Sequence, residues 1–299
     1  MDHKPVMTGE IVSIFAEAPG GVFIDATYGL GGHTKVLISS FRKKFEFIGI
    51  DRDGEILGQA ERDRPAGVVL HKMRFSEIPE MLRREKIEPL TGILFDLGLN
   101  SAQLDDPSRG FSYSKPASLD MRFDRDSGKP AAELLQTLEV DKLIRILKEY
   151  GQQKNSRAIA RAIIAERPTT TESLASLIRN VVGSRRFIKS GARVFQALRI
   201  FINDELEELQ NALSNVIPLM AVGGRLAVIS YHSLEDRIVK RLFLLNSGKC
   251  FCGPEIAECS CGKRSLLEIK TKKPQRPSEK EIMANSRARP ARLRYAERI

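Results

Sequence analysis

The amino-acid sequence predicts an α/β fold, in which helices cover both faces of a doubly wound parallel sheet and a helical subdomain is inserted into it. Two observations lead to this prediction. Short apolar runs alternate with amphipathic segments through the first third of the chain, a pattern that is typical of such sheets. The next convincing core strand begins only at Gly224, and 125 residues separate it from Gly98. One crossover connection needs a fraction of that length, so the excess predicts an insertion.

Strands and helices alternate in the first part of the sequence. A glycine-rich turn, "DATYGLGGHT" at residues 25–34, joins the first apolar run to a helix that reaches Phe41. Further strands are expected at residues 45–50, 67–73 and 91–98, with helices at 53–63 and 78–86. Ligands of such sheets bind outside the carboxyl ends of the strands. We therefore expect the residues at those ends to line a site; they are Asp25, Asp51, Phe75 and Asp96.

We place the inserted helical subdomain at residues 104–190, inside a discontinuous main domain made of residues 1–103 and 191–299. Apolar residues recur at helical spacing in "DKLIRILKEY" and "SRAIARAIIAE". Thr169 and Glu172 have the spacing of a capping box that opens a further helix.

The C-terminal part returns to the main domain. A single long helix is predicted from "VFQALRIFINDELEELQNAL", followed by the strand "GGRLAVISY" and a helix with Ser233 as its N-cap. Two late strands, in "SLLEIKTKKP" and "ARLRYAER", are expected to pair antiparallel and close the sheet.

The bulk composition indicates a polyanionic partner. The chain has 299 residues and a net charge of +10, from 48 basic and 38 acidic residues. Residues 263–299 hold seven arginines and five lysines against four glutamates. Such an excess favours phosphate contacts with RNA or DNA, and a solvated basic tail is the alternative.

The sequence also bears on membrane insertion, secretion and oligomeric state. No apolar run approaches the roughly 18 residues of a membrane span. The N-terminal "MDHKPVMTGEIV" lacks the basic and apolar regions of a secretion signal, so we expect a cytoplasmic protein. The oligomeric state stays open, with a homodimer as one alternative.

The glycine-rich turn indicates the type of ligand. A dinucleotide fingerprint would need a glycine where Thr34 stands, and no P-loop is present. An acid nevertheless follows at the spacing of a ribose-binding residue, because Asp51 lies 20 residues after Gly31. Ribose recognition without phosphate-binding features suits S-adenosylmethionine. The alternative is a tight strand-to-helix connection with no ligand.

Four stretches go beyond generic spacing: "DATYGLGGHT", "DLGLNSAQLDDPSRGFS" with "LDMR", "VFQALRIFINDELEEL" and "ISYHSLEDRIVKR". Together they resemble the bacterial small-subunit (16S) ribosomal RNA cytosine-N4 methyltransferase family, over nearly the whole chain. The resemblance implies a Rossmann-like methyltransferase sheet, S-adenosylmethionine as methyl donor, and methylation of a cytosine in the decoding region, with 16S ribosomal RNA or the small ribosomal subunit as partner.

The resemblance also implies a set of cofactor-binding residues. They are Gly31, Gly32, His33, Asp51, Phe75, Asp96 and Gln103. Three segments depart from the family pattern. Leu99-Asn100-Ser101 stands where valine-serine-serine is usual, Gly151-Gln152-Gln153 replaces glycine-glutamate-glutamate, and "KSGARV" lacks a histidine-proline pair. The first departure bears on the catalytic residues, and the other two bear on RNA contacts.

Catalysis requires acceptors for the hydrogens of a weakly nucleophilic exocyclic amine. Asp96 either faces the reacting centre or anchors the cofactor, and Asn100 offers a carbonyl acceptor. His232 either accepts a proton or orients the start of the following helix. Asp120 and Arg122 either pair to fix a loop or bind the target nucleotide. The nearby aromatics, Phe111 and Tyr113, would stack on the base or pack between the insertion and the main domain.

The four cysteines lie within twelve residues, as Cys250, Cys252, Cys259 and Cys261. In a cytosolic chain such clustering favours a metal over disulfides, and four thiolates suit structural zinc. Free thiols and a disulfide or cluster are the alternatives.

The inserted helices are expected to present a basic face to RNA, including Arg185 and Arg186. Two other functions compete with RNA cytosine methylation: amino-methylation of DNA, and RNA binding by a non-enzymatic assembly factor. The absence of a Pro-Pro-aromatic motif after "DLG" argues against the first, and the intact glycines with Asp51 argue against the second.

Overall fold

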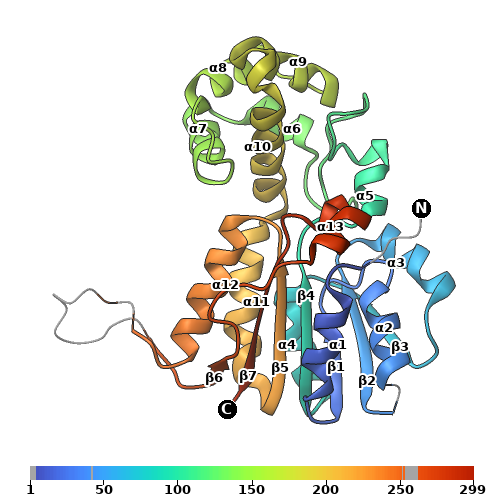
Figure 1. Ribbon diagram of the computed structural model, residues 1–299. Coiled ribbons are helices and arrows are strands. Elements are labelled where there is room, and N and C mark those ends of the chain that lie inside the picture. Colours follow the sequence, from blue (N-terminus) through green and yellow to red (C-terminus); the bar gives the residue numbers. More distant parts are fainter. Residues whose placement is uncertain (1–4, 42, 251, 253–261) are drawn as a thin grey trace. The chain divides into compact units, whose positions relative to one another are not determined.

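A computed structural model describes residues 5–41, 43–250, 252 and 262–299 of the protein. The chain forms two compact units (Figure 1). The first unit is Met1–Gly98 with Leu206–Ile299, and the second unit is Leu99–Glu205. The second unit extends beyond the expected segment 104–190 at both ends. The reason at its C-terminal end is that Ser190 lies in the middle of one continuous helix, α10 (Ser184–Asn203).

The first unit is built on a seven-stranded sheet with the order β3-β2-β1-β4-β5-β7-β6. Its strands are β1 (Gly21–Asp25), β2 (Phe45–Asp51), β3 (Val68–Lys72), β4 (Leu90–Asp96), β5 (Met220–Ser230), β6 (Leu267–Ile269) and β7 (Arg292–Arg298). The first five pair parallel, and β7 pairs antiparallel with both β5 and β6. The parallel sheet and the late antiparallel pair expected from the sequence are therefore confirmed.

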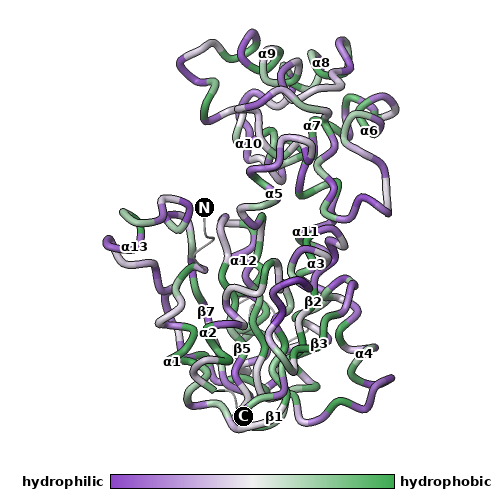
Figure 2. Tube along the Cα trace, turned by 90° about the vertical axis from the view of Figure 1, so that its right-hand side faces the viewer, coloured by the Kyte–Doolittle hydropathy of each residue, from purple (hydrophilic) through white to green (hydrophobic). Residues whose placement is uncertain are grey.

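Helices cover both faces of this sheet. Those of the first unit are α1 (Thr8–Ala16), α2 (Gly32–Phe41), α3 (Gly54–Ala60), α4 (Ile78–Glu85), α11 (Glu205–Val216), α12 (Ser233–Asn246) and α13 (Glu279–Ala284). Apolar side chains of α4, α11 and α12 share one buried cluster with one face of the strands. Those of α1, α2 and α3 share a second cluster with the other face. The strands β1, β2, β4 and β5 are apolar along most of their length because both of their faces are buried. Figure 2 shows apolar residues in green.

The second unit is helical and has its own apolar core. Its helices are α5 (Ser101–Asp105), α6 (Ala131–Thr137), α7 (Val140–Glu149), α8 (Ser156–Glu166), α9 (Thr171–Val182) and α10. Phe111 packs on Phe123, and Tyr113 packs edge-on against Phe187 and Phe195. These two aromatics thus belong to the core of the second unit. Stacking on a base and packing between the two units both stay predictions.

The long helix expected at residues 194–213 is broken in two. Asp204 adopts a left-handed conformation with φ of 51° and ends α10, and α11 begins at the next residue. The buried side chain of Asn203 fixes the break, because it bonds the backbone of Met121 and of Phe123 at 2.8 Å each. No helix of the described residues is long and apolar enough to cross a membrane.

Candidate functional site

The carboxyl ends of β1, β2 and β4 bring three acids to one edge of the sheet, as the sequence predicted. Asp25, Asp51 and Asp96 are the last residues of these strands. The turn after β1 faces the same edge and contains two left-handed glycines, Gly29 with φ of 55° and Gly31 with φ of 75°. A side chain at Gly31 would also collide with Tyr28, since its Cβ would lie 2.5 Å from the phenol oxygen. The turn therefore requires glycine for both conformation and space.

Asp51 is held by backbone donors on both sides. Its Oδ2 accepts a hydrogen bond from the Gly29 N–H at 2.8 Å, and its Oδ1 accepts one from the Asp53 N–H at 2.9 Å. Burial raises the pKa of Asp51 to about 6, although the two backbone hydrogen bonds act to lower it. Each carboxylate oxygen has a second lone pair, so both can accept a further hydrogen bond from a ligand.

His33, in the first turn of α2, lies between Asp25 and Asp96. Its Nε2 is 3.2 Å from Asp96 Oδ2. Burial acts to lower the pKa of His33, but the hydrogen bond and charge of Asp96 and the charge of Asp25 outweigh it and raise the pKa. Nδ1 of the same ring is buried and has no hydrogen-bond partner among the described residues. A protonated imidazole would present an N–H at this position, which is suited to an anionic group.

Asp25 is 1% exposed and stabilises the glycine-rich turn through Thr34. It accepts a hydrogen bond of 2.7 Å from the Thr34 hydroxyl. Burial raises the pKa of its carboxyl, and the neighbouring charge of His33 only partly offsets this. Since Asp25 is buried against α2, we assign it to the architecture of the turn.

Asp96 is fixed by three neighbours. Its backbone N–H donates to the Thr27 hydroxyl at 2.7 Å, and His33 contacts its Oδ2. The phenol of Tyr231, which directly follows β5, donates to its Oδ1 at 2.9 Å. Burial, followed by the charge of Asp96, raises the pKa of Tyr231 well above its ordinary value. The phenol is therefore a permanent donor to Asp96 at neutral pH.

The sequence interpretation missed Tyr231. An aromatic residue at the end of an apolar strand usually belongs to the core, and its role depends on the neighbouring strand, which lies far away in the sequence. The available signal was that the carboxyl ends of β4 and β5 lie side by side. Asp96 pairs with Ile229 in the β4–β5 register, and Tyr231 follows Ile229 by two residues.

Phe75 lies beyond the third strand, because β3 ends at Lys72 and Phe75 opens a short 3₁₀ turn. Its ring packs edge-on against Phe95 of β4, with 5.7 Å between the centroids. Phe75 is partly exposed. Its contact with an adenine stays a prediction.

Asn100 and Gln103 belong to the second unit, where they cap α5 reciprocally. Asn100 Oδ1 accepts a hydrogen bond from the Gln103 N–H at 2.8 Å, and Gln103 Oε1 accepts one from the Asn100 N–H at 3.1 Å. Their expected contacts with an amine and with the cofactor stay predictions. Asp120 and Arg122 pair through two contacts of 2.8 and 3.0 Å, as the loop-fixing interpretation expected.

His232 is the N-cap of α12, where the sequence analysis expected Ser233. Its Nδ1 accepts from the Glu235 N–H at 3.4 Å, and its Nε2 lies 3.1 Å from a Glu235 carboxylate oxygen. Glu235 in turn accepts from the backbone N–H groups of Tyr231 and His232 at 2.8 and 3.1 Å. These contacts support the helix-orienting role for His232 over proton transfer.

The structure describes two of the four clustered cysteines, Cys250 and Cys252. The Cys252 N–H donates to Cys250 Sγ at 3.2 Å. Cys259 and Cys261 lie outside the described residues, so the expected zinc site stays a prediction.

Comparison with known proteins gives a consistent result. The family model described as the MraW methylase family matches residues 1–299. A protein of Thermomicrobium roseum named ribosomal RNA small subunit methyltransferase H is 42% identical and covers 99% of this chain and 94% of its own length. Proteins of the same name from Caldicellulosiruptor saccharolyticus and Halothermothrix orenii are 41% and 40% identical, and each covers 100% of this chain and 99% of its own.

Among solved structures, an rRNA methylase from Streptococcus thermophilus covers 100% of this chain and 99% of its own at 12% identity, with a TM-score of 0.45. That likeness is too distant to support an argument. The family model matches over the full length and the identities are 40–42%, so this chain belongs to the MraW methylase family.

Proposed function

We propose that this protein transfers the methyl group of S-adenosylmethionine to the exocyclic N4 of a cytosine in small-subunit ribosomal RNA. The observation that carries the proposal is the carboxylate of Asp96, which both His33 and Tyr231 contact at the carboxyl ends of the strands. The glycine turn and Asp51, the acid expected to bind a ribose, lie at the same edge of the sheet. The names of the relatives support the RNA substrate.

The residues at this edge fit the cofactor. Asp51 has acceptor capacity left on both oxygens for the hydroxyls of a ribose. The unpartnered Nδ1 of His33 would bind the carboxylate of the amino-acid tail. Gly31 and Gly32 leave room for Tyr28 and Pro5, which pack closely against the turn that would hold the ligand. When bound, S-adenosylmethionine supplies a methyl group that its sulfonium has already activated.

Asp96 would accept a hydrogen bond from the cytosine amine. The lone pair of that nitrogen is delocalised into the ring, so it becomes a better nucleophile when an acceptor holds its hydrogens. An acceptor that gains strength as the nitrogen becomes positive stabilises the transition state more than the ground state. Tyr231 and His33 each occupy one lone pair of Asp96, which fixes the carboxylate plane and leaves a further lone pair on each oxygen.

The second unit would contribute RNA binding. Exposed basic residues lie on α8, α9 and α10, including Arg157, Arg161, Arg179, Arg185 and Arg186. Phosphate contacts of this kind position RNA without reading its sequence. The target base would have to be unstacked or already single-stranded to reach a strand-end pocket.

Transfer of labelled methyl groups tests the proposal. The full chain is incubated with methyl-labelled S-adenosylmethionine and either small-subunit RNA or assembled small subunits, and the RNA is digested to nucleosides. Labelled N4-methylcytidine is expected, and its yield should fall strongly in Asp96→Asn. Label in any other nucleoside would refute the amine assignment. Label in DNA would favour the DNA enzyme, and RNA binding without any label would favour the assembly factor.

A further inference from the structure

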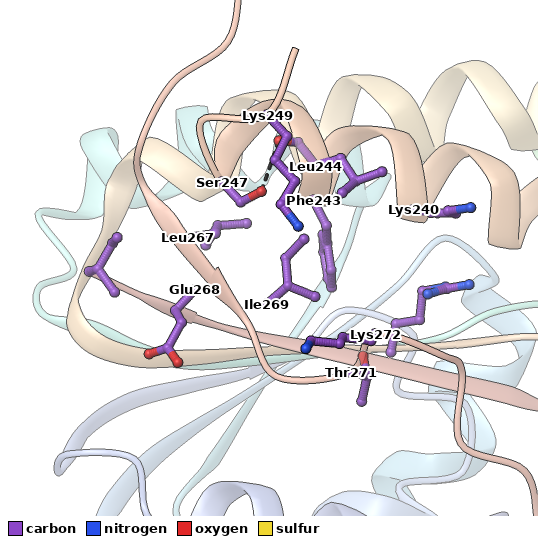
Figure 3. A pocket seen from close by; sticks show the side chains of 12 residues that line it. Lys240, Phe243, Leu244, Ser247, Lys249, Leu267, Glu268, Ile269, Thr271 and Lys272 are labelled. Atoms are coloured by element: carbon purple, nitrogen blue, oxygen red, sulfur yellow. Dashed lines mark hydrogen bonds between the residues drawn. The ribbon is translucent and has the colours of Figure 1, made fainter. Parts of the chain in front are cut away.

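A cavity of about 550 Å³ opens in the first unit, beside α12, β6 and the segment that follows β6 (Figure 3). Its floor is apolar: Phe243 and Leu267 are each 1% exposed, and Ile269 is half-buried beside them. None of its lining residues belongs to the strand-end site. The size lies within the range of pockets that bind small molecules or single building blocks of a polymer.

Three exposed lysines surround this floor. Lys240 comes from α12, Lys249 follows the end of α12, and Lys272 follows β6, so the charges come from both sides of the cavity (Figure 3). Their ammonium groups form no ion pair within the part of the chain that the structure describes. Three cations without partners around one mouth favour an anionic ligand.

The other charged lining residues are already neutralised. Arg294 donates from its Nε to Asp236 at 2.6 Å. The carboxylate of Glu268 is 2.6 Å from the Lys270 ammonium group. Among the described side chains that line the cavity, the three lysines are therefore the charges without an ion-pair partner.

This combination fits one class of ligand better than others. An unpaired nucleotide has a planar, weakly polar base of a size that the cavity accommodates, and phosphates on both sides for the lysines. Binding sites for single-stranded nucleic acid combine a basic surface with apolar or aromatic contacts to the bases. A membrane surface fits poorly, because Phe243 and Leu267 are buried at the bottom of the cavity and Ile299 is the one exposed apolar side chain among its lining residues. A polymer is favoured over a free nucleotide by the basic residues around the mouth, which continue through Lys263, Lys273 and Arg276.

We propose that this pocket binds an unpaired nucleotide of the RNA substrate and provides a contact remote from the reacting base. The inference rests on the proposed function, because it takes RNA to be the substrate. It assigns a role to the basic C-terminal region, whose charge the methyl-transfer site does not use.

Two matched double variants of the full chain test the pocket. Lys240→Gln with Lys272→Gln removes two charges that line it and keeps the aliphatic stems. Lys43→Gln with Lys86→Gln removes two exposed charges elsewhere in the first unit that do not line it. Binding of a fluorescent, uridine-only RNA is measured at several salt concentrations, with the thermal unfolding midpoint as a control for folding.

The pocket variant should bind more weakly, and the log–log salt slope should become shallower by roughly 1.4, or about 0.7 per single-strand contact. The control variant should keep both values within error. RNA that carries 4-thiouridine should cross-link to peptides containing residues 240–249 or 267–272. Equal losses in both variants, or cross-links confined to other peptides, would overturn the proposal. So would stronger competition at this site by an acidic peptide than by RNA.

Methyl transfer by the unmodified chain separates this inference from the function on which it rests. If the unmodified chain methylates small-subunit RNA and the pocket variant keeps full RNA affinity and slope, the pocket assignment alone fails. If the unmodified chain transfers no methyl group to RNA, the proposed function fails whatever the variants show.

Discussion

Replacing Asp51 with Asn tests whether an ionised carboxylate at the end of β2 binds the cofactor ribose. In the folded protein the pKa of this carboxyl is about 6, because burial outweighs the bonds from the Gly29 and Asp53 N–H groups. Ribose hydroxyls are donors, so they favour the ionised form. With a pKa of 6, roughly a tenth of the carboxyl is ionised at pH 5 and nearly all of it at pH 7.5. The affinity for S-adenosylmethionine should therefore rise about tenfold over that interval, which equals about 1.4 kcal/mol.

The Asn variant should bind weakly at every pH. An amide keeps one acceptor oxygen, so its NH₂ group must face one of the two backbone donors that now contact Asp51. The loss of a charge-assisted hydrogen bond costs about 1.5–3 kcal/mol, which is roughly 10- to 150-fold in affinity at pH 7.5. The part of the pH dependence that Asp51 causes should disappear in this variant.

Isothermal titration with S-adenosylmethionine at pH 5, 6 and 7.5 measures both effects. Asp63→Asn serves as the control, because Asp63 is exposed and pairs with Lys35 on the surface. The titrations of His33 and of the cofactor itself affect both proteins equally. Subtracting the pH dependence of Asp51→Asn from that of the unmodified chain therefore leaves the contribution of Asp51. Equal pH dependence in both proteins, or undiminished affinity in Asp51→Asn, would remove Asp51 from the site.

Three further predictions concern other parts of the protein. Tyr231→Phe should lower kcat by roughly tenfold or more, since it removes a hydrogen bond to a charged acceptor worth about 1.5–3 kcal/mol. The thermal unfolding midpoint should stay nearly constant. An unchanged kcat would mean that the phenol has only a structural role. Arg185→Ala with Arg186→Ala should weaken RNA binding and flatten its salt slope by roughly 0.7–0.9 per contact without changing cofactor affinity, and Arg145→Ala is the exposed control. Elemental analysis of protein purified without added metal should find near-stoichiometric zinc, and four titratable thiols without zinc would exclude the metal site.

The sequence predicted those features that depend on local pattern. The strand ends at Asp51 and Asp96 follow from apolar runs that stop at a polar residue, and parallel pairing then brings them to one edge. Which of two neighbouring residues caps a helix was less predictable. Thr170, with Ser173, caps α9 where Thr169 with Glu172 was expected, because the Thr169 carbonyl accepts a backbone hydrogen bond from Leu119.

Features that depend on distant contacts could not be predicted. The hydrogen bond between Tyr231 and Asp96 joins residues 135 positions apart. The break at Asp204 depends on Asn203, whose amide bonds a loop some 80 residues earlier. The periodicity of the surrounding sequence is helical on both sides of the break, so it contains no sign of it.

The interleaving of the two units has a consequence for biosynthesis. The second unit is one uninterrupted stretch, whereas the first unit needs residues from both sides of it. On the ribosome, β4 emerges well before its neighbour β5, and the second unit is completed between them. The second unit can therefore fold first, while β4 still lacks one partner strand. We expect the nascent chain to expose the growing edge of the sheet during this interval, which makes it the stage most sensitive to chaperones and to pauses in translation.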